Sequence, residues 1–74
     1  MNWRFMHGVA GDLILPKKSG IYITQTTNHT YESMIYLAKT KSFYDAVARK
    51  QDLKKIIKWI PQDEYFLHFL KNIN

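Results

Sequence analysis

The chain has no cysteine, and only two prolines, three glycines and six acidic residues stand among its 74 positions. The lack of cysteine excludes disulfides and cysteine-based zinc sites, so the fold depends on its apolar core. No apolar run approaches the ~20 residues that cross a bilayer as a helix. The first residues, MNWRFMHG, lack the apolar core and cleavage site of a secretory signal. We therefore expect a cytoplasmic protein that does not enter a membrane.

Signatures of catalysis and of bound metals or cofactors are also lacking. The three histidines, His7, His29 and His68, lie far apart, and none belongs to a metal-binding His-x-x-x-His or Glu-x-x-His pair. No glycine-rich phosphate loop or nucleophile elbow is present. The sequence therefore predicts no catalytic residue, no metal and no cofactor, and we expect a protein that is not an enzyme. No motif identifies a known family.

The residues that are plentiful are apolar and aromatic, at 46% and 15% of the chain. Disorder is therefore not expected, and the length allows one domain, residues 1–74. A domain of this size buries only about 60% of the surface that its unfolded chain exposes. Formation of a homodimer is one further way to stabilise so small a core.

Three strands are predicted in the first half of the chain. Residues 21–26 are β-branched and aromatic, and the turn residues before them suggest a hairpin with residues 12–15. After a polar turn at 27–30, residues 31–38 alternate as a strand that completes an antiparallel meander. The segment 31–39 also fits a helix capped by Thr30, and this alternative stays open.

The pattern from Ser42 to Ile60 favours a helix over about 43–60. Ser42 and Asp45 have the spacing of a capping box. Leu53 begins an apolar series with the i, i+3, i+4, i+7 spacing of one helix face, completed by Ile56, Ile57 and Ile60. Asp52 allows either continuation or a fresh helix start within this range.

A second helix is predicted over about 61–72, with Pro61 in its first turn. Asp63 and Glu64 suit the positive end of the helix dipole, and Lys71 suits the negative end. Its wide apolar face comprises Tyr65, Phe66, Phe69, Leu70 and Ile73. The predicted fold class is thus α+β, a small antiparallel meander (12–15, 21–26, 31–38) followed by two helices (43–60, 61–72).

The excess of positive charge is concentrated in the centre of the chain. The whole protein has a net charge of +5, and seven basic residues stand between positions 39 and 58 against two acidic ones. The candidate binding residues are Lys39, Lys41, Arg49, Lys50, Lys54, Lys55, Lys58 and the neighbouring Trp59. On a helix they would form a basic surface with an aromatic flank, or an ordinary solvated face.

These features predict a small non-enzymatic binding protein, of the inhibitor or adaptor type found in phages and mobile elements. Its expected partner is a protein of the nucleic-acid machinery, engaged through the basic, aromatic-flanked helix. The alternative is a regulator that binds nucleic acid itself, making nonspecific phosphate contacts through the same lysines. Lysine suits nonspecific phosphate attraction better than base reading, for which arginine is the usual residue.

Overall fold

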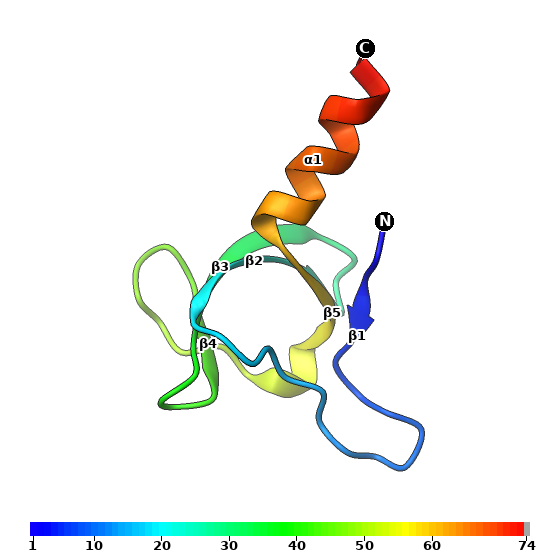
Figure 1. Ribbon diagram of the computed structural model, residues 1–74. Helices are drawn as coiled ribbons and strands as arrows, with labels where there is room; N and C mark the ends of the chain where they lie inside the picture. The colour runs from blue at the N-terminus through cyan, green and yellow to red at the C-terminus, as the bar shows by residue number, and fades with distance from the viewer. Residues whose placement is uncertain (74) are drawn as a thin grey trace.

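Five antiparallel strands and one C-terminal helix form the computed structural model (Figure 1). It describes residues 1–73, without the side chains of Asn72 and Ile73, so the place predicted for Ile73 lies outside the described side chains. The strands are β1 (Arg4–Phe5), β2 (Gly20–Thr26), β3 (Tyr31–Leu37), β4 (Ser42–Tyr44) and β5 (Ile56–Pro61). A 3-10 turn, η1 (Leu53–Lys55), precedes β5, and helix α1 (Gln62–Ile73) follows it.

The central strand is β2, which has a neighbour on each side in a sheet of order β1-β5-β2-β3-β4. It pairs with β3 through Ile21 and Ile35, and with β5 through Thr24 and Trp59. The predicted strands at 21–26 and 31–38 are confirmed, and the helical alternative for 31–39 is wrong. A four-residue turn joins them, closed by the amide of Thr26 donating to the carbonyl of Thr30 at 2.9 Å.

The predicted hairpin between residues 12–15 and 21–26 is wrong. Both edges of β2 are taken by β3 and β5, which leaves no edge for residues 12–15. These residues turn back on the N-terminal segment instead. Leu13 makes an isolated bridge with His7, and the amide of Ile14 donates to the carbonyl of Met6 at 2.7 Å.

The predicted helix over 43–60 is also wrong, because this range holds β4, a loop, η1 and β5. Asp45 turns the chain in place of a helix start, since its Oδ1 accepts from the amides of Val47 and Arg49. Ala48 then has a left-handed φ of 64°, which no right-handed helix accommodates. Ser42 is buried in β4 and donates to the carbonyl of Thr40 at 3.0 Å.

The apolar series that resembled a helix face belongs to a strand that is buried on both sides. Ile56 and Trp59 pack in the main core, whereas Ile60 is buried opposite Ile23 on the other face of the sheet. A strand covered on both faces reads as a nearly continuous apolar run, and β-branched isoleucine favours strands. The run Ile56–Ile60 is therefore strand β5.

The helix predicted over 61–72 is confirmed as α1, with Pro61 as the last residue of β5. Asp63 and Glu64 lie in its first turn and Lys71 in its last, as the dipole favours. The α+β fold class therefore holds, with one helix where two were predicted. Within residues 1–73, no helix is both long and apolar enough to cross a bilayer.

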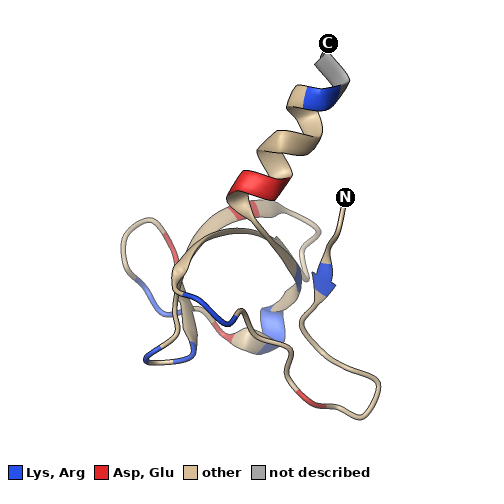
Figure 2. Ribbon diagram, viewed as in Figure 1, with Lys and Arg blue, Asp and Glu red and all other residues tan. Residues whose placement is uncertain are grey.

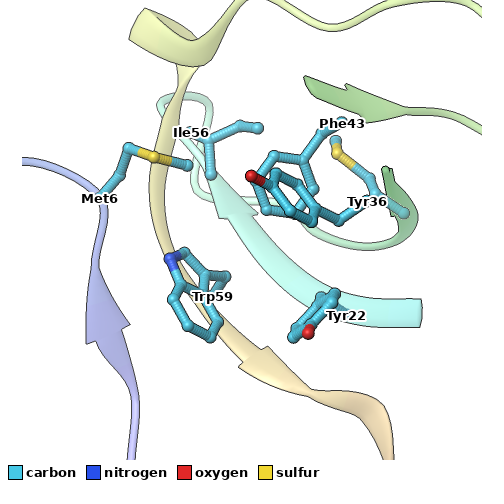
Figure 3. Packing of buried hydrophobic residues seen from close by; sticks show 7 residues of the cluster. Met6, Tyr22, Tyr36, Phe43, Ile56 and Trp59 are labelled. Atoms are coloured by element: carbon cyan, nitrogen blue, oxygen red, sulfur yellow. The ribbon is translucent and has the colours of Figure 1, made fainter. Parts of the chain in front are cut away.

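The core lies inside the curve of the sheet and is rich in aromatic rings (Figure 3). The ring of Tyr22 meets those of Tyr36, Phe43 and Trp59 edge-on, at centroid distances of 6.1, 6.2 and 5.3 Å. Edge-to-face pairs of this kind stabilise a core beyond their buried area. Burial is also the main reason that the pKa values of Tyr22 and Tyr36 are raised. Strands β2 to β5 thus each supply one or two large side chains to the core, and Met6 after β1 adds another.

Candidate binding site

A cleft of about 660 Å³ opens where the N-terminal loop, the turn between β3 and β4, and residues 50–54 meet. Its lining includes the lysines Lys41, Lys50 and Lys54 and the leucines Leu13 and Leu53. We call it the basic cleft, defined by these five residues. Figure 2 shows that lysine and arginine gather in the loops away from α1, whereas the first turn of α1 is acidic.

Lys41 reaches the basic cleft from the turn between β3 and β4. Its backbone has a φ of 53°, in the left-handed region that costs a residue with a Cβ roughly 1–2 kcal/mol. Hydrogen bonds hold the turn in this shape: the amide of Ala38 donates to Ser19 Oγ at 2.8 Å, and Thr40 shares a 3.0 Å bond with the Tyr44 hydroxyl. Strain is thus present at a position that lines the cleft.

Lys50 is held by the loop that Asp45 organises. The Asp45 carboxylate accepts three hydrogen bonds at 2.9–3.0 Å, from the amides of Val47 and Arg49 and from the guanidinium of Arg49. These bonds, led by the Arg49 amide, hold the pKa of Asp45 below its usual range. The loop then returns to the sheet, because Lys50 bridges Tyr44 and the amide of Gln51 donates to the Phe43 carbonyl.

Lys54 is placed by a cap on η1. Asp52 Oδ1 accepts from the amide of Lys54 at 3.0 Å, and the Asp52 carbonyl accepts from Lys55 at 2.9 Å. The sequence allowed Asp52 either to begin a new helix or to continue the previous one. In the structure Asp52 caps only a single 3-10 turn. Leu53 packs inward against the core from the same turn. The turn therefore supplies both a charge and an apolar contact to the cleft.

The N-terminal loop supplies the remaining wall through Leu13 and His7. Gly11 takes a φ of 81° at its tip, a conformation that side chains rarely adopt. The loop is fixed to β5 because the Trp59 indole Nε1–H donates to the carbonyl of Ile14 at 2.8 Å. The wall of the cleft therefore depends on a core residue of the last strand.

The predicted binding residues divide into two groups. Lys41, Lys50 and Lys54 line the cleft; Lys39 and Lys55 are exposed beside them in sequence, on the β3–β4 turn and on η1. The other three lie elsewhere or are occupied. Arg49 is paired with Asp45, Lys58 lies 4.7 Å from the Trp3 ring centroid, and Trp59 is only 7% exposed in the core. The expected basic helix with an aromatic flank does not exist.

Sequence reasoning missed the leucines and His7 as parts of the cleft. Leu53 looked like one position of a helix face, and Leu13 like part of a hairpin strand. His7 precedes Gly8, and the short loop closed by the Gly8 amide donating to the Asp12 carbonyl carries it to the cleft. Such a return of the chain has no local sequence signal.

The chemistry available in the basic cleft is attraction of an anion. Three ammonium groups against the one carboxylate of Asp52, with two leucines, suit a ligand that carries negative charge beside an apolar group. No group of three or more metal-binding side chains occurs among the described residues. A comparison with models of protein families found no match to this chain, and comparisons with curated proteins and solved structures found none either.

Proposed function

We propose that this is a non-enzymatic binding protein, an inhibitor or adaptor of the type found in phages and mobile elements. Its basic cleft would hold an acidic surface of a protein that belongs to the nucleic-acid machinery. One observation carries the proposal: Lys41, from the turn between β3 and β4, and Lys50 and Lys54, from the segment before β5, line one cleft. A solvated charge face needs no such convergence.

The lining favours an acidic protein segment over a bare phosphate chain. Leu13 and Leu53 stand beside the lysines, so the cleft offers apolar contact as well as positive charge. A segment with carboxylates around one apolar side chain satisfies both. The apolar anchor would supply affinity, and the charges would speed and orient the encounter.

The choice of nucleic-acid machinery rests on where carboxylates cluster in proteins. Polymerases and nucleases hold divalent cations with groups of Asp and Glu side chains that are open to their substrates. A small protein with a net charge of +5 is attracted to such a negative surface over a distance. Occupying that surface would inhibit the larger enzyme.

Nucleic acid is the second candidate. The exposed Lys39 and Lys55 adjoin cleft lysines in sequence, so the positive charge extends beyond the lining itself. The buried position of Trp59 counts against it, because binding of single strands depends largely on stacking of bases on exposed aromatic rings. Contacts to phosphates alone would give weak sequence preference and steep salt dependence.

The two candidates are separated by fluorescence anisotropy at several salt concentrations. The probes are a labelled peptide with glutamates around one leucine, the same peptide with alanine for leucine, and labelled single- and double-stranded oligonucleotides. We expect the leucine peptide to bind most tightly. The Lys41→Glu/Lys54→Glu double variant should lower its affinity about tenfold or more, as loss of interfacial charge pairs does.

The matched control is Lys17→Glu/Lys18→Glu, which changes the net charge equally at two exposed lysines outside the cleft. Equal losses in both double variants would mean that only net charge matters, and the cleft proposal would fail. If the oligonucleotides bind and the peptides do not, nucleic acid is the ligand and the second candidate is selected. No binding of any probe at low salt would overturn both.

A further inference from the structure

Helix α1 presents large apolar side chains to solvent beyond its first turn. Phe66, Leu67 and Leu70 are 51%, 53% and 56% exposed, and Phe69 is 45% exposed. Tyr65 contacts the N-terminal segment, with its ring centroid 6.1 Å from that of Trp3. Leu67 borders a hollow that Met1, Asn2 and Ile60 also line, and it is still more than half exposed. The exposed series is therefore not covered by the rest of the described chain.

Only the beginning of α1 is joined to the sheet by polar contacts. Ser33 Oγ donates to Gln62 Oε1 at 3.1 Å, and Arg4 pairs with Glu64 at 3.0 Å. The rest of the helix extends away from the sheet (Figure 1). A helix of 12 residues is marginal by itself in water, because most helical stability in proteins comes from packing. Its outer half therefore requires a second surface.

The charges along α1 indicate which kind of partner surface is complementary to it. Asp63, Leu67 and Lys71 are spaced by four residues and form one row along the helix, with Phe66 and Leu70 in the adjacent row. Asp63 and Lys71 are exposed, and neither makes an ion pair within the part of the chain that the structure describes. Leu67 lies midway between the opposite charges.

We propose that α1 pairs antiparallel with α1 of a second copy of this chain, with the two-fold axis beside Leu67. Because Asp63 and Lys71 are equidistant from Leu67, the antiparallel pair places Asp63 opposite Lys71 of the partner subunit, and symmetry repeats the contact. A parallel pair would bring like charges together at both ends. The row of charges thus selects one orientation.

The surface that this dimer buries is small. A large side chain has ~150–250 Å² of surface, and about half of it is exposed in each of the four apolar residues. Together they offer on the order of 400 Å² per copy for burial in the dimer. Two copies bury about 800 Å², below the ~1,200 Å² of standard stable interfaces. The dimer accordingly belongs with the weak, transient associations at the low end of interface size.

Sedimentation equilibrium over a wide range of protein concentration tests the proposal, because a small interface associates only at high concentration. The mass should rise from monomer to dimer across this range. Leu67→Glu should raise the dissociation constant at least tenfold, because it places two carboxylates at the axis. Leu37→Glu is the control, since Leu37 is 41% exposed on strand β3. A monomeric wild-type protein, or equal effects of both variants, would overturn the dimer.

Charge reversal tests the antiparallel arrangement. The variants Asp63→Lys and Lys71→Asp should each remain monomeric when alone. In either variant, position 63 of one copy and position 71 of the other carry charges of the same sign. An equimolar mixture of the two variants should form a heterodimer, in which both pairs join opposite charges again. Circular dichroism confirms that each variant keeps its helix. A mixture that stays monomeric, or single variants that dimerise like the wild type, would exclude the antiparallel pairing.

Discussion

The indole Nε1–H of Trp59 donates a 2.8 Å hydrogen bond to the backbone carbonyl of Ile14. This bond ties the loop that walls the basic cleft to the last strand of the sheet. The ring that makes it is 7% exposed and packs edge-on against Tyr22 at 5.3 Å. Trp59 therefore supports the wall of the cleft from within the core, and its ring is too buried to contact a ligand.

Trp59→Phe should lower the free energy of unfolding by roughly 1–3 kcal/mol, because the Ile14 carbonyl loses its donor. Trp3→Phe is the matched control: Trp3 is partly buried and makes ring contacts with Tyr31 and Tyr65. Urea unfolding followed by circular dichroism compares the two variants. If the Trp59 variant loses no more stability than the Trp3 variant, the hydrogen bond does not hold the loop.

The acid dependence of stability should depend on Asp45. Its pKa is lowered in the folded state, so the carboxylate stabilises the fold at pH values above the ordinary 3.8. This contribution is lost as the pH falls through the lowered folded-state value. Asp45→Asn lacks the contribution at every pH. The gap in melting temperature between the wild type and Asp45→Asn should therefore be wide at neutral pH and narrow in strong acid. A gap that is constant with pH would contradict this.

Stability and binding should separate at the strained Lys41. Lys41 and Ala48 have φ values of 53° and 64°, and replacement by glycine removes the Cβ that makes this conformation costly. Lys41→Gly and Ala48→Gly should each stabilise the fold by up to about 1 kcal/mol, a rise in melting temperature of roughly 4–8 °C. Thermal unfolding measures both.

Only Lys41→Gly should also weaken binding of the leucine peptide, because Ala48 lies outside the basic cleft. Anisotropy titration of the two glycine variants provides the comparison. Unchanged affinity in a stabilised Lys41→Gly protein would remove Lys41 from the site. Equal losses in both variants would indicate that the affinity depends on loop shape and not on the lysine.

Local signals predicted β2, β3 and α1. Strands β2 and β3 are joined by a short turn, and α1 has charges of the right sign at each end, so neighbouring residues suffice to identify them. Strand β5 differs, because its run Ile56–Ile60 is buried on one face by the core and opposite Ile23 on the other. Its partners are β1 and β2, which lie far away in the sequence. The spacing alone matched a helix.

The sequence indicated the charge of the basic cleft but not its geometry. Of the predicted basic residues, Lys41, Lys50 and Lys54 line the cleft. The prediction also included Lys58 and Trp59, which the strand structure of β5 turns toward Trp3 and toward the core. The leucine walls come from residues 13 and 53, which only the folded chain brings together. No pattern along the chain contains that information.

The strand order also determines when this protein completes its fold during synthesis. Strand β1 pairs only with β5, through Arg4 and Trp59, so the first strand waits for the last one to leave the ribosome. Contacts this distant in sequence slow folding, typically to milliseconds or seconds in small proteins dominated by strands. Until β5 arrives, the edge of β2 that receives it stays unpaired and can associate with other chains. The nascent protein is thus most vulnerable to aggregation shortly before its last strand emerges.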